Sequence, residues 1–239
     1  MFAFAVIPAR GGSKGLPGKN LMRVGPLSLI GHAVASARES RLLTRAIIST
    51  DDSAIVAEAK AIGAEVPFVR PAELASDEAG MVPVLQHAVR WLEGEGGRPD
   101  LVVLLQPTSP FRTGADIDAV IRKVVETHAD SAQSLIDVSY HPYFMSTLEG
   151  DRVQPLFPAE RDKYVRRQDT PRVYQPSGSV YVVRRAVLMD EDRILGRDHR
   201  GVVMGWESSV KIDTEWEFRL AELVFASGRV PLSEERRRA

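Results

Sequence analysis

The sequence predicts an α/β fold, a mostly parallel sheet with helices on both faces. Strand-like and helix-like segments alternate along the 239 residues. The apolar runs 2–7 and 101–105 are continuous rather than alternating, which is typical of strands buried on both faces. A loop rich in glycine and positive charge follows the first run. Because ligands in such sheets bind beyond the carboxyl ends of the strands, we expect three layers with the site at that edge.

In the first half of the chain, a strand at 2–7 is expected to precede a helix at 29–37 and a short buried strand at 46–49. Asp52 comes next and is placed to cap a helix that runs to about residue 62, since an aspartate side chain accepts hydrogen bonds from first-turn N–H groups. The segment 81–92 is predicted to be a helix with one apolar face, formed by Val84, Leu85, Ala88, Trp91 and Leu92.

The second half continues the alternation after the central strand. A helix is expected at 116–125 and a strand at 131–138. Regular patterns then return with a strand at 179–184. The last two elements predicted are a strand at 208–212 and a helix at 214–225.

Residues from about 140 to 175 break this pattern, because prolines, charges and aromatic residues mix there without a clear period. A loop that long is uncommon in a compact domain unless it has a function. We therefore expect one domain over 1–228 that includes this excursion, as suits a chain of 239 residues. The remaining 229–239 is expected to be a tail whose arginine-rich end, 234–238, is solvated; a binding arm is the alternative.

Composition limits the partners and the location. The formal net charge is −1, whereas proteins that bind nucleic acid usually carry a strong basic excess, so nucleic acid is not an expected partner. The absence of cysteine excludes disulfides and cysteine-bound metal. Met1 leads directly into a strand without a visible signal peptide, and no apolar run approaches membrane-spanning length. We expect a cytoplasmic protein with no membrane contact.

The loop 8–20 combines four glycines with the cations Arg10, Lys14 and Lys19. Glycine lets backbone N–H groups turn inward, and a run of such groups forms a concave anion site that suits a polyphosphate. The Walker A pattern does not fit, because the glycine spacing is too long and an asparagine replaces the required hydroxyl. The dinucleotide-binding pattern fails because the first two glycines are adjacent. A glycine-rich surface turn is the alternative interpretation.

This loop resembles the opening motif of the CMP-sialic acid synthetases (acylneuraminate cytidylyltransferases), and other blocks of that family follow in the same order from about residue 4 to about residue 224. These blocks are Ser49-Thr50-Asp51, Arg70 to Asp77, Leu105 to Arg112, Arg167-Gln168 and Ile212-Asp213-Thr214. The resemblance implies a Rossmann-like nucleotidyltransferase fold of GT-A type with a dimer-forming excursion at about 140–175. It also implies activation of an acidic sugar by CTP, with release of pyrophosphate.

On the CTP side, Arg10, Ser13 and Lys19 are the best candidates to hold the phosphates, and Lys19 is expected to stabilise charge at the α-phosphate. A solvated lysine is the alternative. Arg70 precedes a proline and, by resemblance, belongs to the block that lines the cytosine pocket; a surface arginine is its alternative. The residues expected to bind CTP are Ala9, Arg10, Gly11, Gly12, Ser13, Lys19, Asn20, Arg70 and Ala79.

On the acceptor side, two prolines bracket two hydroxyls after Gln106, which gives a stiff loop suited to recognising a substrate. Arg112 is expected to bind an acceptor carboxylate through two hydrogen bonds, with a structural ion pair as the alternative. By resemblance, Arg167 reaches the site of the neighbouring subunit. The residues expected to bind the acceptor are Gln106, Thr108, Ser109, Arg112, Arg167, Gln175 and Tyr181.

Asp213 is the expected metal ligand, because Mg²⁺ takes one or two carboxylates together with substrate phosphate oxygens and water. Mn²⁺ is the other candidate metal, and a helix N-cap is the alternative role for this aspartate. Typical family members read Asp-Ile-Asp where this chain has Lys211-Ile212-Asp213, so a cation replaces the first carboxylate. We expect the catalytic residues to be Arg10, Lys19, Lys211 and Asp213.

Three activities are consistent with the sequence. The first is a homodimeric CTP-dependent cytidylyltransferase that transfers CMP to a sialic-type (nonulosonic) acid. The second keeps the reaction but uses a small phosphonate or carboxylate such as phosphonoformate, because the departures from the family lie on the acceptor side while the CTP loop is intact. The third, prompted by Lys211, is a nucleotide-binding protein without turnover.

Overall fold

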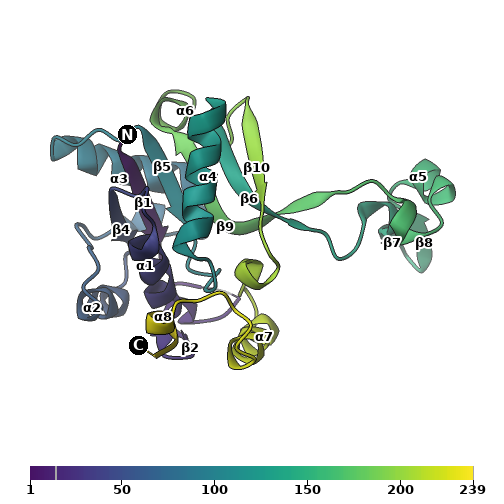
Figure 1. Ribbon diagram of the computed structural model, residues 1–239, viewed down its shortest axis with the longest axis horizontal. Helices are drawn as coiled ribbons and strands as arrows, with labels where there is room; N and C mark the ends of the chain where they lie inside the picture. Colours follow the sequence, from purple (N-terminus) through teal and green to yellow (C-terminus); the bar gives the residue numbers. More distant parts are fainter. Residues whose placement is uncertain (14, 239) are drawn as a thin grey trace.

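A six-stranded sheet forms the centre of the molecule in the computed structural model, which describes residues 1–13 and 15–238 (Figure 1). Its strands, in the order in which they lie side by side, are β10 (His199–Val203), β6 (Ser131–Asp137), β9 (Tyr174–Arg184), β5 (Leu101–Leu105), β1 (Ala3–Pro8) and β4 (Arg45–Ser49). All strands run in the same direction except β9, which pairs antiparallel with β5 and β6. The predicted mostly parallel sheet is confirmed.

Helices cover both faces of this sheet, which makes three layers. One face packs against α1 (Leu29–Glu39), α2 (Ser53–Ala61) and α4 (Gly114–Thr127), and the other packs against α3 (Met81–Gly94) and α6 (Arg185–Asp190). Alternate residues of the central strands point into the two hydrophobic clusters, which explains why the apolar runs of β1 and β5 are continuous. The predicted cap of α2 is confirmed, since the Asp52 side chain accepts hydrogen bonds from the N–H groups of Ala54 and Ile55.

The edge strand β10 was not predicted, and the strand expected at 208–212 is wrong. That region contains a single short 3-10 helix, η5 (Glu207–Ser209), followed by irregular backbone. The apolar residue Ile212 does not pair in the sheet: its N–H donates to the Thr108 carbonyl at 2.9 Å, and its side chain joins a third hydrophobic cluster. A short apolar run therefore served a loop-packing role that periodicity alone does not separate from a strand.

Residues 138–173, called the arm below, leave the sheet between β6 and β9 and stand well away from it (Figure 1). The arm consists of η3 (Pro142–Phe144), the hairpin β7 (Ser146–Glu149) and β8 (Arg152–Pro155), the helix α5 (Pro158–Lys163) and η4 (Arg167–Asp169). A small aromatic cluster holds it together, with Tyr143 stacked on Tyr164 and edge-on to Phe157. The segment without clear periodicity thus has secondary structure of its own.

The C-terminal residues return to the body of the protein and pack at the end where β2 (Arg23–Val24) lies (Figure 1). Helix α7 (Glu215–Ala226) and the short helix α8 (Glu234–Arg238) are joined by a segment whose Val230 and Leu232 are buried in the third cluster. Arg236 is only 2% exposed, so the expectation of a solvated tail is wrong for this end of the chain. Two further elements complete the fold near this edge, the hairpin β2 (Arg23–Val24) with β3 (Leu27–Ser28). None of the described helices combines the length and apolarity needed to cross a membrane.

Candidate active site

A cavity of about 480 Å³ opens at the carboxyl ends of β1 and β5, where Pro8 ends one strand and Gln106 follows the other. This is the edge at which ligands bind in open parallel sheets. The residues that line it come from four separate parts of the chain, 8–20, 70–84, 106–108 and 211–213. They are Pro8, Arg10, Ser13, Gly15, Lys19, Asn20, Arg70, Leu74, Ser76, Asp77, Ala79, Met81, Val84, Gln106, Pro107, Thr108, Lys211 and Asp213.

The glycine-rich loop forms one wall of this cavity, so it is not a plain surface turn. Lys14, one of its predicted cations, lies outside the described residues. Gly11 donates its N–H to Asp51 Oδ1 at 3.2 Å, which means that this N–H already binds a negatively charged oxygen. Gly15 passes so close to the chain that an added Cβ would lie 2.7 Å from the Asp213 carbonyl oxygen. Glycine at that position permits the loop to approach the residue expected to hold a metal.

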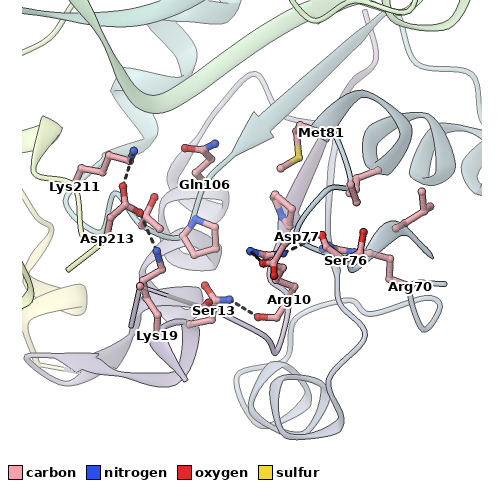
Figure 2. Close-up of a pocket in the computed structure, with 18 residues that line it drawn as sticks. Arg10, Ser13, Lys19, Arg70, Ser76, Asp77, Met81, Gln106, Lys211 and Asp213 are labelled. Carbon is pink, nitrogen blue, oxygen red and sulfur yellow. Dashed lines mark hydrogen bonds and ion pairs between the residues drawn. The ribbon is translucent and has the colours of Figure 1, made fainter. Parts of the chain in front are cut away.

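Lys19 and Lys211 hold Asp213 between them, an arrangement called the lysine–aspartate bridge below (Figure 2). Lys19 Nζ lies 2.9 Å from Asp213 Oδ1, and Lys211 Nζ lies 2.7 Å from Oδ2. The Lys19 side chain is 13% exposed, so it is not a solvated surface lysine. Partial burial acts to raise the pKa of the Asp213 carboxyl, but hydrogen bonds from Lys211 and Lys19 outweigh it and lower that pKa overall. The carboxylate is therefore ionised and faces the cavity.

Asp213 is not the N-cap of the helix that follows it. That position belongs to Thr214, whose side chain accepts from the Glu217 N–H while the Glu217 carboxylate accepts from the Thr214 N–H in a capping box. The same carboxylate oxygen of Glu217 accepts from the Asp213 N–H at 2.8 Å. The cap thus fixes the backbone of Asp213 and leaves its side chain for the cavity.

The far end of the cavity, where Met81 and Arg70 lie in Figure 2, is more apolar. Arg70 is 4% exposed, so it is not a surface arginine; its guanidinium donates to the Ser49 hydroxyl and carbonyl oxygens at the end of β4. Burial lowers the pKa of Arg70, with nearby Arg10 acting in the same direction. Leu74, Ala79, Met81 and Val84 add apolar surface at this end.

Arg10 connects the glycine-rich loop to this apolar end. Its guanidinium donates to the Ser76 carbonyl at 2.9 Å and pairs with Asp77 at 2.7 Å. Asn20, which is buried, donates its side-chain N–H to the Arg10 carbonyl at 3.0 Å and so holds the start and the end of the loop together. The cavity therefore has a more apolar end, a middle formed by Arg10 and Ser13 of the glycine-rich loop, and an end where the lysine–aspartate bridge meets Gln106 and Thr108.

The structure gathers many of the predicted residues in this cavity and places others elsewhere. Those that line it are Arg10, Ser13, Lys19, Asn20, Arg70, Ala79, Gln106, Thr108, Lys211 and Asp213. Ala9 is fully buried beneath it, and its N–H donates to the Ser49 carbonyl. Gly11 and Gly12 belong to the loop without lining the cavity. Tyr181 lies on β9, packed beside the second hydrophobic cluster, where burial raises its pKa and the Lys211 charge acts in the opposite direction.

The prediction that Arg112 binds an acceptor carboxylate is corrected by its position. Arg112 is fully buried, and its guanidinium donates to the Ser36 hydroxyl and to the carbonyls of Gln106 and Ser179. Ser109 is also buried and turned away from the cavity lining. The bonding partners of Arg112 are neutral, so it is a structural residue but not through the ion pair that was the alternative.

Arg167 and Gln175 lie at the arm, away from the cavity. Arg167 is exposed in η4 and donates to the Val138 carbonyl at 3.4 Å, while Gln175 is exposed near the start of β9. Neither residue lines the cavity of its own chain.

Several lining residues escaped the sequence interpretation. Ser76 and Asp77 stood in a recognised block but were given no role, although they anchor Arg10. Met81 was predicted only to begin a helix and Val84 to lie on its apolar face, and nothing in the periodicity distinguishes a core position from one beside a cavity.

Comparison with known proteins places the chain among nucleotide-transferring enzymes. Residues 4–196 match the family model described as cytidylyltransferase. A CMP-N,N'-diacetyllegionaminic acid synthase of Legionella pneumophila is 31% identical over 93% of this chain and 95% of that protein. The post-translational flagellin modification protein B of Campylobacter coli is 29% identical over 91% and 92%. An N-acylneuraminate cytidylyltransferase of Escherichia coli is 30% identical over 91% of this chain and 50% of its own length.

Solved structures support the fold. A CMP:2-keto-3-deoxy-manno-octonic acid synthetase complexed with CTP superposes with a TM-score of 0.69 at 18% identity, covering 95% of this chain and 100% of that chain. The 4-diphosphocytidyl-2C-methyl-D-erythritol synthase of Anaerococcus prevotii gives a TM-score of 0.62 at 13% identity, covering 94% and 98%. At such identities the likeness establishes the architecture.

Proposed function

This chain belongs to the cytidylyltransferase family, and from that premise we propose that it transfers CMP from CTP to a sialic-type, nonulosonic acid. In the reaction, an acceptor oxygen bonds to the α-phosphorus while the bond from that phosphorus to pyrophosphate breaks. Such chemistry depends mainly on positioning and on stabilising charge. The observation that carries the proposal is one cavity that joins an apolar end at Arg70 to a cation-rich loop and the lysine–aspartate bridge.

The cavity suggests how each substrate lies. Cytosine suits the more apolar end near Ala79 and Met81, and the triphosphate suits Arg10, Ser13 and Lys19, which extend from there to the lysine–aspartate bridge. Lys19 is then placed to stabilise charge at the α-phosphate. Gln106 and Thr108 line the end of the cavity beside the lysine–aspartate bridge and would meet the acceptor.

A divalent cation, Mg²⁺ or Mn²⁺, fits the one carboxylate that faces this part of the cavity. The described residues contain no group of three His, Cys, Asp or Glu side chains able to hold a metal by themselves. Mg²⁺ is commonly held by one or two carboxylates with the remaining positions taken by substrate phosphates and water, so Asp213 suffices as the protein ligand. When bound, the ion would neutralise charge on the phosphates. Each Asp213 oxygen bonds one lysine and keeps a further lone pair for such a ligand.

A nonulosonic acceptor is supported by the relatives, which carry the names of synthases for legionaminic, pseudaminic and acylneuraminic acids. A second candidate, a small phosphonate or carboxylate such as phosphonoformate, is favoured by Lys211. This lysine adds a positive charge at the acceptor end, and its side chain packs 3.6 Å from the position a Cβ would take on Gly178.

The arm supports a homodimer. Several of its large apolar side chains face solvent in the single chain, namely Tyr140, Leu148, Val153 and Val165, each at least 64% exposed. Apolar patches of this kind mark interaction sites. A partner seated on the arm would bring Arg167 near a second copy of the site.

Pyrophosphate release from CTP and Mg²⁺ tests the proposed function. The acceptors are N-acetylneuraminate, other nonulosonic acids, phosphonoformate and none. We expect release with a nonulosonic acid, and chelation of the metal should abolish it. Release with phosphonoformate alone would replace the first acceptor class with the second. No release with any acceptor, while CTP still raises the melting temperature, would leave a nucleotide-binding protein.

Lys211→Asp tests whether this lysine has a working role in the site. We expect the variant to lose activity, because a second carboxylate would stand beside Asp213 in place of a cation only 2.7 Å from it and repel an acidic acceptor. The kcat/KM for each acceptor measures this effect. A gain with nine-carbon acids would contradict a working role for Lys211.

A further inference from the structure

The loop 106–112 forms the acceptor wall of the cavity, and its backbone carbonyls are held by hydrogen bonds from three directions. Arg112 Nη1 donates to the Gln106 carbonyl at 3.1 Å, and the Ile212 N–H donates to the Thr108 carbonyl at 2.9 Å. The remaining bonds come from Arg236, whose Nη2 donates to the Pro110 carbonyl at 2.7 Å and whose Nη1 donates to the Arg112 carbonyl at 2.8 Å. A residue almost at the end of the chain therefore fixes the loop that faces the substrate.

Arg236 is buried, and its contacts hold its side chain in one position. It is 2% exposed, and its other partners are the His32 carbonyl at 3.2 Å, the His32 ring nitrogen Nδ1 at 3.3 Å and the Glu39 carboxylate at 3.3 Å. A buried guanidinium needs partners for its charge and its donors; both terminal nitrogens of Arg236 have them, whereas its Nε has none among the described residues. Its planar fork can reach several carbonyls at once, which an ammonium group cannot do with the same geometry.

The loop also positions the segment 211–213, which carries two residues of the lysine–aspartate bridge. Ile212 stands between Lys211 and Asp213, and its N–H is the group bonded to Thr108. The side chains of Phe111 and Ile212 pack in the same hydrophobic cluster as Val230 and Leu232, which belong to the segment leading to α8. A shift of the loop would therefore move Thr108 and Asp213 together.

We propose that Arg236 is a positioning residue for the acceptor side of the active site. It fixes the backbone of the loop 106–112 at Pro110 and Arg112. Through the Thr108–Ile212 hydrogen bond, the loop then keeps Lys211 and Asp213 in place relative to Gln106. Helix α8 is then tied to the acceptor side of the site through the Arg236 side chain. The expected effect on acceptor kinetics rests on the proposed function, whereas the expected effect on the structure of the loop does not.

The test compares Arg236→Met, which keeps an apolar stem and removes the donors, with Arg237→Met as the matched control. Arg237 is the next residue of the same helix, but its guanidinium donates to carbonyls of its own C-terminal segment, at Gly228, Val230 and Leu232. For Arg236→Met we expect kcat/KM for the acceptor to fall about tenfold to a hundredfold, since small misplacements of binding groups have effects of that size. The dissociation constant for CTP should change less than threefold, which is about the effect of losing one weak, exposed contact.

Arg236→Lys provides the conservative variant. It keeps the charge but loses the fork, so we expect a smaller defect in the same direction and a folded protein even if the methionine variant fails to fold. A merely structural role predicts a different pattern, in which melting temperature, CTP affinity and acceptor kinetics decline together in all three variants. Equal losses in Arg236→Met and Arg237→Met, or unchanged acceptor kinetics in folded Arg236 variants, would overturn the proposal.

Amide hydrogen exchange keeps this test separate from the fate of the proposed function. In Arg236→Met and Arg236→Lys, the peptide over 106–112 should exchange faster than in the parent protein, while the strand 3–8 should not. This measurement needs no acceptor. If the parent protein transfers CMP to none of the acceptors, the proposed function fails, yet faster exchange in the loop still supports the positioning role. Unchanged exchange there would refute it.

Discussion

Asp213 accepts a hydrogen bond on each carboxylate oxygen, and the two donors come from opposite ends of the chain. Lys19 is 194 residues away in sequence, whereas Lys211 is two residues away. With two cations around one anion, the group has a net positive charge that favours phosphate. Because Lys19 is also the more buried lysine, its charge is screened less by water than that of Lys211.

Substitution of Lys19 should therefore damage chemistry rather than folding. Lys19→Ala is expected to lower kcat by about a hundredfold or more, the usual loss when an electrostatic contact to a transition state is removed. Pyrophosphate release under saturating CTP measures it. Lys60→Ala, at an exposed position in the last turn of α2, is the control and should turn over normally. A near-normal rate for Lys19→Ala would contradict its catalytic role.

His32 makes stability depend on pH. Burial lowers its pKa from 6.5 to about 4, and the charges of Arg236 and Arg112 act in the same direction. Between these values the unfolded chain binds a proton that the folded chain does not, so stability falls as the pH drops from about 6.5 to about 4. The full contribution is about 3 kcal/mol, because one pKa unit is worth about 1.4 kcal/mol.

Denaturant unfolding at pH 7 and at pH 4.5 tests this prediction. His32→Asn should be less stable than the parent protein at pH 7, where the neutral imidazole donates to the Val24 carbonyl at 2.8 Å. The difference in unfolding free energy between the two proteins should shrink at pH 4.5, because the parent protein is destabilised there by proton binding to His32 in its unfolded chain. A difference that stays constant with pH would show that His32 does not titrate on unfolding.

At the scale of elements, α7 illustrates how a helix start can serve a site. Its capping box begins one residue after Asp213, and Glu217 accepts from the N–H groups of both Asp213 and Thr214. The helix therefore fixes the backbone of the cavity residue, while the carboxylate remains available to ligands. The arm is the opposite case, since its hairpin and helix contact little of the body and leave apolar side chains exposed.

Asp213→Ala and Glu217→Ala should separate the ligand from its support. We expect Asp213→Ala to lose nearly all turnover and its dependence on Mg²⁺. Glu217→Ala should cost about 1 kcal/mol of stability, as loss of a helix cap does, with a much smaller loss of turnover. Activity against Mg²⁺ concentration and unfolding in urea measure the two effects. Similar turnover in both variants would remove the metal role of Asp213.

At the scale of the whole molecule, the exposed apolar side chains of the arm bear on the proposed homodimer. Val165 on the arm is 83% exposed, and Leu223 on α7 is an exposed apolar residue of the body at 69%. Val165→Asp is expected to weaken the proposed dimer without changing the melting temperature of the monomer, because the arm lies outside the three clusters of the core. Leu223→Asp is the control for a charge placed on the body. Sedimentation velocity measures the assembly state, and a parent protein that is monomeric at all concentrations would contradict the dimer.

Local patterns were sufficient for much of the fold and for the place of the glycine-rich loop beside the candidate site. The strands β1 and β5 follow from continuous apolar runs, and the cap of α2 follows from one aspartate after a strand. The glycine-rich loop needed only its place after β1 to be assigned to the sheet edge. These features depend on residues close together in sequence, so a single stretch contains the physical information that determines them.

Tertiary structure alone decided the contacts between distant segments. Arg112 and Arg236 look like a substrate-binding residue and a solvated one in the sequence, yet both are buried and donate to backbone carbonyls. The direction of an arginine side chain is set by which carbonyls other segments leave within reach, and no local period records that. For the same reason the pairing of Lys19 with Asp213 had to come from the packed molecule, whereas the sequence by itself determined the glycine-rich loop, its cations and its place after the first strand.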